Sequence, residues 1–193
     1  RDRSVSRGLG DVYKRQPDAI PWIIACEDLG NTDDFDFNDI VFSVSHAAGS
    51  TEAIVTPLAA GGILDARIYY NDQELGEIHT LLGQSRLTIT NTQSSKGTPG
   101  SPIKITVPET YSVTNDMGGF SIRIINNEKE ATAIKAPENG TAPQMICIDG
   151  STGWAWPTER TNISDAYPAF GEWGANYATN KDWYKNASGS VVK

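Results

Sequence analysis

The stretch WIIACEDLGNTDDFDFNDIVFSVSH, residues 22–46, joins two apolar runs through a strongly acidic connection. This acidic connection, residues 27–39, holds six acidic side chains and two asparagines. No Lys or Arg lies between Arg15 and Arg67 to balance its charge. Carboxylates this close together repel one another, and a bound cation is one way to keep them ionised. The two apolar runs and the acidic connection set the expectations for both the fold and the site.

The runs that flank the acidic connection have the patterns of β-strands. Residues 21–26, PWIIAC, form a short apolar run bounded by a proline and acidic residues, which favours a buried strand. Residues 39–46, DIVFSVSH, alternate apolar and polar side chains, which is typical of a strand with one buried face. Similar runs follow between turn-rich segments: 51–60 (TEAIVTPLAA), 64–70 (LDARIYY), 85–90 (SRLTIT), 101–108 (SPIKITVP), 118–125 (GGFSIRII) and 143–149 (PQMICID).

Many short strands at turn-marked spacing predict an all-β fold, an antiparallel β-sandwich of jelly-roll-like type with one or two short helical inserts. The pair Asn71-Asp72 predicts a tight turn between two of the strands. Residues 76–83, GEIHTLLG, favour a single helical turn. Residues 163–177, ISDAYPAFGEWGANY, carry aromatic side chains at spacings of three, three and four. That spacing predicts a short amphipathic helix with Pro168 in its first turn.

Residues 1–16 differ from the rest of the chain. They are basic, and DVYKRQ at residues 11–16 is what GAT GTG TAT AAG AGA CAG encodes. That DNA resembles the transposon end used to fragment sequencing libraries. Residues 1–16 are therefore interpreted as a non-native, disordered segment, with a natural basic tail as the alternative. Residues 17–193 are interpreted as one β-sandwich domain.

The charge of the remaining chain argues against several classes of partner. Removing the five basic and two acidic residues of the first sixteen from totals of 16 and 24 leaves 11 and 22, a net charge of −11. Nucleic acids and anionic membrane surfaces both require basic patches, so neither is an expected partner. No apolar run approaches the length of a membrane span, so no membrane insertion of this domain is expected.

The two cysteines, Cys26 and Cys147, both have apolar neighbours in the sequence. Two buried free thiols, packed as small apolar side chains, are the preferred interpretation. A disulfide between them is the alternative if the protein is exported, because oxidising compartments favour such bonds.

The acidic connection has the spacing of an oxygen-ligand site. Asp34, Asp36 and Asn38 place an oxygen-bearing side chain at every second position, and Glu27 and Asp39 flank them. Ca²⁺ binds six to eight oxygens from carboxylates, amides, backbone carbonyls and water. The order matches the start of an EF-hand, but the glycine and final glutamate of that motif are missing, and the next segment is a predicted strand. The sequence therefore predicts a Ca²⁺ site in another fold, and a solvated acidic loop without metal is the alternative.

The segment WIIACEDLGNTDDFDFNDIVF resembles the motif of the LruC-type domain, which is found in exported or lipid-anchored bacterial surface proteins. The similarity continues through residues 77–83 (EIHTLLG), 142–148 (APQMICI) and 154–173 (WAWPTERTNISDAYPAFGEW). It therefore covers nearly everything from Pro21 to Trp183. The resemblance implies a β-sandwich-like extracellular domain with a calcium site and no settled activity. By position it implies metal ligands at Glu27, Asp34, Asp36, Asn38 and Asp39, with Asp28 and Asp33 as weaker candidates.

Four of the five tryptophans lie between Trp154 and Trp183. In extended backbone Trp154 and Trp156 would share one face and could stack on sugar rings. The preferred interpretation is that both rings close the core and bury apolar area. Glu159 and Asp165 could likewise supply the carboxylate pair of a glycoside hydrolase, but nothing in the sequence fixes their separation.

These features predict a secreted or surface-anchored bacterial module with a structural Ca²⁺ site, acting in binding or cell-surface architecture and not as an enzyme. The first alternative is a carbohydrate-binding module that uses Trp154 and Trp156, and the second is a glycoside hydrolase-related enzyme domain. A glycan or a surface protein is the expected partner. The expected location is the extracellular space or the outer cell surface, with the periplasmic side as a further alternative.

Overall fold

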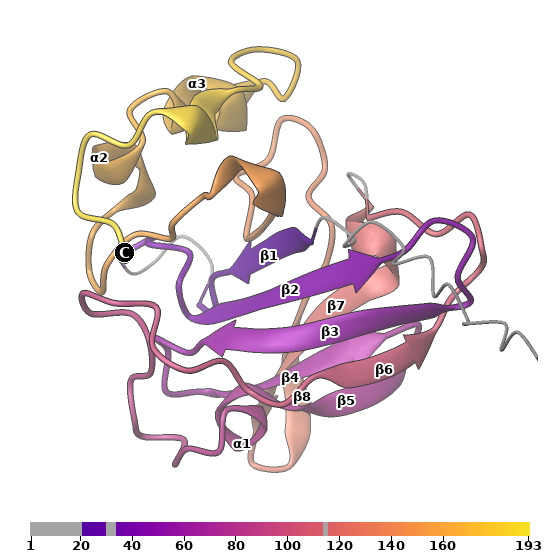
Figure 1. Ribbon diagram of the computed structural model, residues 1–193. Coiled ribbons are helices and arrows are strands. Elements are labelled where there is room, and N and C mark those ends of the chain that lie inside the picture. The colour runs from indigo at the N-terminus through magenta and orange to yellow at the C-terminus, as the bar shows by residue number, and fades with distance from the viewer. Residues whose placement is uncertain (1–20, 30–33, 114–115) are drawn as a thin grey trace, which may run out of the picture.

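The computed structural model describes residues 21–29, 34–113 and 116–193, so the segment interpreted as non-native at residues 1–16 lies outside them. Two antiparallel sheets form the expected β-sandwich (Figure 1). Sheet A has the strand order β6-β3-β2-β1-β9, and sheet B has the order β5-β4-β7-β8. The strands are β1 (Trp22–Cys26), β2 (Ile40–His46), β3 (Glu52–Ala59), β4 (Asp65–Tyr70), β5 (Gln73–Glu77), β6 (Ile103–Thr106), β7 (Phe120–Asn126), β8 (Lys129–Ile134) and β9 (Met145–Asp149).

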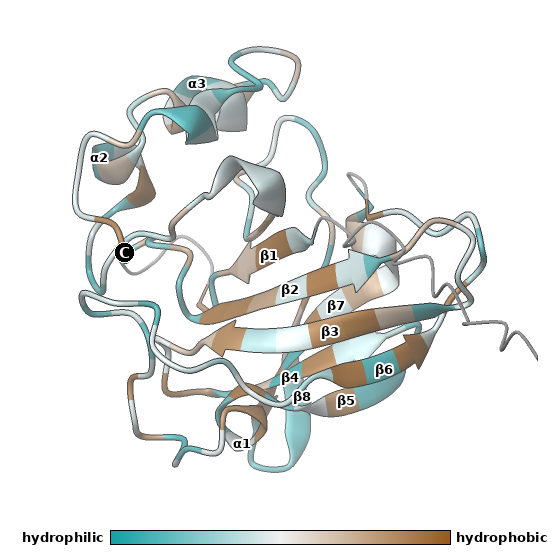
Figure 2. Ribbon diagram, in the orientation of Figure 1, coloured by the Kyte–Doolittle hydropathy of each residue, from teal (hydrophilic) through white to brown (hydrophobic). Residues whose placement is uncertain are grey.

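Sheet A has an apolar core on each of its faces. Alternate side chains of a strand point to opposite faces, so Ile24 of β1 and Phe42 of β2 enter the inner core between the sheets. Ile23 and Val41, one position earlier, enter a second, outer core on the other face. Both faces of β1 are therefore covered, as the continuous apolar run predicted, and Figure 2 shows apolar residues along β1, β2 and β3.

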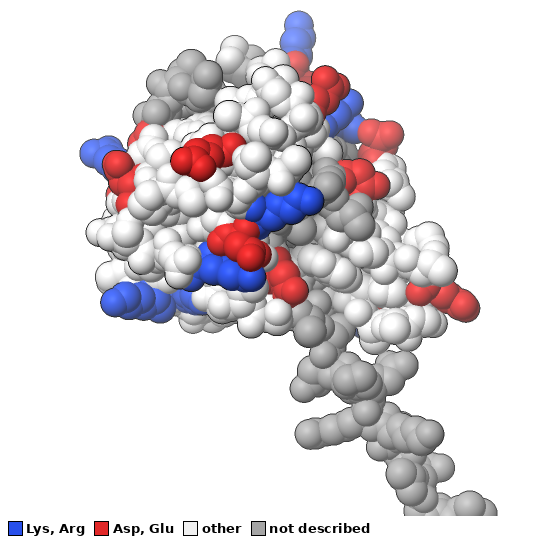
Figure 3. Space-filling view, turned by 90° about the horizontal axis from the view of Figure 1, so that it is seen from above, with Lys and Arg blue, Asp and Glu red and all other residues white. Residues whose placement is uncertain are grey.

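The C-terminal residues supply the cover of the outer core. Residues 154–193, here called the outer layer, run across sheet A on the face opposite sheet B (Figure 1). Their aromatic side chains Trp154, Trp156, Tyr167 and Phe170 are buried against the sheet. Seen from above, most of the surface is uncharged and the acidic and basic side chains are interspersed (Figure 3).

Residues 163–177 of the outer layer contain two short α-helices where the sequence predicted one. They are α2 (Ile163–Ala166) and α3 (Phe170–Ala175). Pro168 lies between them, and a proline disfavours helical backbone in the residue before it. Tyr167 accordingly has φ −135° and ψ 88°, which ends α2 before α3 begins.

The other short helices are α1 (Ile78–Leu81), η1 (Met117–Gly119), η2 (Gly150–Thr152) and η3 (Trp183–Lys185). The helix α1 confirms the helical turn predicted within residues 76–83. The Glu77 carboxylate accepts hydrogen bonds from the backbone N–H groups of His79 and Thr80 at its start. Among the described residues, no helix is long and apolar enough to cross a membrane.

One predicted strand is wrong and two strands were not predicted. Residues 85–90 form turns and a single bridge between Thr90 and Ala60, whereas β6 pairs with residues 52–55 of β3. Leu87 of that segment is largely exposed. The strands β5 and β8 lie at the two edges of sheet B and carry few apolar residues, so their sequences lack the alternation of a half-buried strand.

The turn predicted at Asn71-Asp72 is confirmed and accounts for β5. Both residues have positive φ, 45° and 65°, as a tight hairpin turn requires. The turn brings β5 back along β4, with Tyr70 opposite Gln73. This polar segment is therefore a strand because of the turn before it.

Candidate metal centre

The acidic connection lies between the end of β1 and the start of β2, under the outer layer. Asp33 lies outside the described residues. Asp36 and Asn38 are almost fully buried, at 1% and 0% exposed, whereas Asp34 and Asp39 are half-buried. Burying polar side chains without partners is costly, so their partners decide what this segment can bind.

Two phenylalanines hold the acidic connection in an unusual backbone conformation. Phe35 and Phe37 have φ of 55° and 54°, in the left-handed region that bulky residues rarely adopt. The Phe37 ring is buried and lies 4.9 Å from the Phe35 ring and 5.5 Å from that of Phe170 in α3. Strained backbone of this kind persists only where its surroundings enforce it, and it is common at ligand sites.

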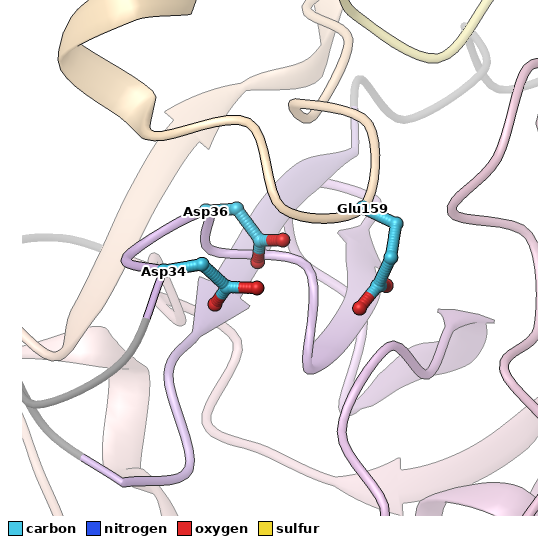
Figure 4. A group of neighbouring side chains, drawn as sticks. All are labelled: Asp34, Asp36 and Glu159. Carbon is cyan, nitrogen blue, oxygen red and sulfur yellow. The ribbon is translucent and has the colours of Figure 1, made fainter.

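Three carboxylates converge next to this strained backbone. Asp34, Asp36 and Glu159 each offer an oxygen that lies within 4.8 Å of the other two. Figure 4 shows that Asp34 and Asp36 come from the acidic connection, Glu159 comes from the loop before α2, and the carboxylates point toward one another. Two of the predicted ligands thus meet a third carboxylate that the motif does not contain.

The side chain of Asn38 adds an amide oxygen to this group. Its Nδ2 donates to the carbonyl of Pro157 at 3.2 Å, and because that oxygen can only accept, Oδ1 must point the other way. Oδ1 is buried and has no hydrogen-bond partner. A Cβ added to Gly61 would lie 1.9 Å from Asn38 Oδ1 and 3.0 Å from Glu159 Oε2. The amide oxygen and the Glu159 carboxylate therefore lie on the same side of Gly61.

Backbone contacts hold Asp36 in place within this group. The N–H of Arg160 donates to Asp36 Oδ2 at 2.8 Å, and the N–H of Asn38 donates to Oδ1 at 3.2 Å. Burial and the neighbouring Asp34 carboxylate nevertheless raise the pKa of Asp36 to about 7, against the lowering effect of these two hydrogen bonds. The apo site therefore retains a proton or requires a compensating positive charge.

Glu159 was missed as a candidate ligand because it is far away in sequence. The sequence analysis names it only as one of two carboxylates of a glycoside hydrolase. Its Oε2 accepts from Thr92 Oγ1 at 3.0 Å, and its N–H donates to the Thr92 carbonyl at 2.7 Å. No spacing rule within a motif links Glu159 to the acidic connection, so only the fold brings them together.

Glu27 lies close to the group but is not one of its three carboxylates. It is fully buried, its Oε1 accepts a hydrogen bond from the N–H of Phe37, and its Oε2 is buried without a partner. Burial raises the pKa of Glu27 to about 8, and the carboxylates of Asp36 and Asp34 contribute in the same direction. Its role as a ligand stays a prediction.

Asp39 pairs with Asp28 instead of joining the three carboxylates. Asp39 Oδ2 accepts the N–H of Asp28 at 2.9 Å. A Cβ added to Gly62 would lie 2.2 Å from Asp28 Oδ2 and 3.0 Å from Asp39 Oδ1, so both carboxylates border this glycine. Burial, followed by the carboxylates of Asp28 and Glu27, raises the pKa of Asp39. Its assignment as a ligand likewise stays a prediction.

The group of Asp34, Asp36, Glu159 and Asn38 consists only of oxygen donors. Such donors suit Ca²⁺, which completes its shell with backbone carbonyls and water, better than Zn²⁺, which prefers nitrogen and sulfur. The two histidines have other contacts. His46 Nε2 lies 2.8 Å from the Ser50 carbonyl oxygen, and His79 Nδ1 lies 2.7 Å from Glu77 Oε1.

Trp154 and Trp156 present no exposed face to a sugar. Each is only 2% exposed, which agrees with the preferred interpretation that they close the core. Trp156 donates its Nε1–H to the Asn91 carbonyl at 2.9 Å, and the Trp154 ring stacks on Tyr167 with centroids 6.1 Å apart. Both rings of the alternative sugar-stacking pair are therefore packed inside the protein.

Cys26 and Cys147 are both free thiols. They lie on the neighbouring strands β1 and β9, but Cys26 is opposite Met145 and Cys147 is opposite Ile24. The cysteines are thus diagonal neighbours, which are farther apart than the directly opposite positions that a disulfide would need. Burial raises the pKa of Cys147 to about 12, so its reactive thiolate is disfavoured.

A family described as a domain of unknown function (DUF4842) matches residues 126–184. No curated protein and no solved structure matches the chain. The matched range covers under half of the chain. It contains Glu159, α2 and α3 but not the acidic connection.

Proposed function

We propose that this chain is a secreted or surface-anchored bacterial module of the LruC type, built around a structural Ca²⁺ site and acting in binding or cell-surface architecture. The ligands from the acidic connection would be Asp34 and Asp36 through their carboxylates and Asn38 through Oδ1. Glu159 would complete the set from the other side. Ca²⁺ would neutralise the carboxylates, and the protein's part is to hold these oxygens around one point.

The observation that carries this proposal is the buried, unpartnered Oδ1 of Asn38 beside three converging carboxylates. A solvated acidic loop would satisfy each oxygen with water and would not need to bury one. The backbone strain at Phe35 and Phe37 supports the same conclusion, since an ordinary surface loop has no reason to retain it. A cation gives both features a physical cause.

Thermal unfolding in excess CaCl₂ and in chelator tests the proposal. An extracellular module of this kind would have a dissociation constant on the order of 10⁻⁴ to 10⁻³ M. With free Ca²⁺ about a hundredfold above that constant, binding adds about 2.7 kcal/mol to the free energy of unfolding. For a domain of this size that corresponds to a rise in Tm of roughly 5–10 °C.

Substitutions separate a metal site from a general effect of salt. Asp36→Ala and Glu159→Gln should each remove most of the calcium-dependent rise in Tm. Glu52→Ala should keep it, because Glu52 is an exposed residue of β3 that forms a surface ion pair with Lys104, away from the acidic connection. Identical melting curves in calcium and in chelator for the unsubstituted chain would contradict the proposal.

The alternative of carbohydrate binding through Trp154 and Trp156 is not favoured by any contact of these residues. Both rings are buried, and Trp156 uses its only polar group on the backbone of Asn91. Architecture or binding through another surface is therefore the form of the proposal that the geometry supports.

A further inference from the structure

The outer layer and the acidic connection are joined by neutral hydrogen bonds between segments far apart in sequence. The N–H of Ile163 donates to the Phe35 carbonyl at 2.9 Å. The side-chain amide of Asn162 donates to the Asp34 carbonyl at 3.2 Å, and that of Asn38 donates to Pro157. Residues 157–163 and residues 34–38 therefore form one interlocked unit, in which the backbone contacts favour a docked outer layer.

The side-chain charges across the same junction act in the opposite direction. Asp34 and Asp36 lie on one side and Glu159 on the other, with carboxylate oxygens within 4.8 Å of each other. Like charges at this distance, in a partly buried site, repel strongly. A divalent cation between them turns that repulsion into attraction, so whether the junction favours docking depends on the ion.

The arrangement of the two cores allows the outer layer to open independently. The inner core lies between sheets A and B and contains none of the outer-layer residues. The outer core joins the other face of sheet A to side chains such as Trp156, Phe170 and Trp183. Opening of the outer layer would expose this second core while the β-sandwich keeps its own.

We propose that the Ca²⁺ site acts as a clasp that controls docking of the outer layer on sheet A, an inference that rests on the proposed function. In the calcium-loaded protein residues 154–193 are docked. When calcium is withdrawn, they open locally and the β-sandwich stays folded. The aromatic side chains of the outer core are then accessible only where calcium is scarce.

Hydrogen–deuterium exchange on the full chain, in excess CaCl₂ and in chelator, tests this clasp. In chelator, peptides from residues 154–193 should exchange well before peptides from β4 and β7, and excess CaCl₂ should slow their exchange. Opening that destroys the site is suppressed by the factor by which calcium exceeds its dissociation constant. With free calcium about a hundredfold above that constant, exchange in the outer layer should therefore slow by about a hundredfold.

Two variants provide a matched comparison within the outer layer. Glu159→Gln removes the carboxylate that the outer layer contributes, so its exchange should lose most of the calcium dependence. Asp165→Asn changes an exposed carboxylate of α2, outside the group of three, and should keep the full calcium dependence. If Glu159→Gln does not fold, the comparison of the unsubstituted chain in calcium and chelator still decides the question.

Calorimetric titration of the same samples with CaCl₂ distinguishes the two proposals. Heat of binding, together with outer-layer exchange that in chelator is faster than that of β4 and β7 and that calcium slows, supports the clasp. Heat of binding with outer-layer, β4 and β7 peptides that all exchange together in chelator, or with no effect of calcium on exchange of the outer layer, overturns the clasp and leaves the calcium site intact. No heat of binding overturns both proposals.

Discussion

At the scale of single residues, the notable feature is a pair of acidic side chains that are buried next to other acids. The folded-state pKa of Asp36 is about 7 and that of Glu27 is about 8, both well above the ordinary values of 3.8 and 4.5. Burial is the first cause for each, and neighbouring carboxylates are a further one. In metal-free protein these groups therefore titrate near neutral pH, where exposed carboxylates are fully ionised.

These pKa values predict an unusual pH dependence for the metal-free protein. Because both folded-state values are raised, the folded protein binds more protons than the unfolded chain between about pH 4 and pH 8. The stabilisation is complete below the unfolded-state values and is lost as pH rises through 7 and 8. In metal-free buffer, Tm measured by circular dichroism should fall between about pH 5 and pH 8.

A substitution and added calcium both test that pH profile. Asp36→Asn should flatten the fall in Tm, because it removes one of the titrating groups, whereas Asp165→Asn should leave it unchanged. Excess CaCl₂ should also flatten it, since a bound cation favours the ionised carboxylates. A Tm in metal-free buffer that rises steadily from pH 5 to pH 8 would contradict the burial of these acids.

At the scale of elements, the site depends on how closely two connections approach each other. The segment that follows β3 passes directly against the acidic connection, and the N–H of Gly61 donates to the Asn38 carbonyl at 2.9 Å. A side chain at Gly61 would occupy the space that Asn38 Oδ1 now holds. The glycine is required here by the close approach of the segments, because its φ lies outside the left-handed region.

Gly61→Ala should therefore destabilise the protein. Its Cβ would have to displace a buried side chain, and overpacking of this kind costs about 1–3 kcal/mol. Urea unfolding measures this change in the free energy of unfolding. Gly171→Ala is the matched control, because nothing lies within 4 Å of a Cβ at that position in α3 and alanine favours a helix. Equal stability of the two variants would show that Asn38 can move away at no cost.

At the scale of the whole molecule, the chain forms three layers: sheet B, sheet A in the middle, and the outer layer. Residues 22–126 supply β1 to β7, and the C-terminal part supplies β8, β9 and the outer layer. Residues 126–184, which match the family of unknown function, contain parts of all three layers. Within that range β8 pairs with β7 in sheet B, whereas β9 pairs with β1 in sheet A. The matched range therefore has almost all of its strand partners elsewhere in the chain.

A fragment of residues 126–184 should consequently fail to fold alone. Its two strands belong to different sheets, and its aromatic residues would lack the face of sheet A against which they are buried. Its amide NMR spectrum should show the narrow dispersion of an unfolded chain, while residues 17–193 should give a well-dispersed spectrum. A dispersed, cooperative spectrum from the fragment would mean that the matched range is an independent domain.

The sequence by itself determined the class of the fold and three of the four residues of the candidate site. Alternation of apolar and polar residues identified β2, and a short apolar run identified β1. Both strands were predictable because burial on one or both faces of a strand leaves a pattern in its own sequence. The turn at Asn71-Asp72 was predictable for the same reason, because the backbone conformation of a tight turn favours particular residues. Asp34, Asp36 and Asn38 were identified as candidates because ligands from one loop would follow a short spacing.

Only the tertiary structure decided which distant segments meet. Glu159 joins Asp34 and Asp36 through the docking of the outer layer on sheet A, and no local pattern encodes that contact. Residues 85–90 have a strand pattern but pair only through one bridge, whereas β5 and β8 have little pattern but pair along β4 and β7. Strand pairing and ligand convergence are non-local, because their free energy depends on a partner that a stretch of sequence does not contain.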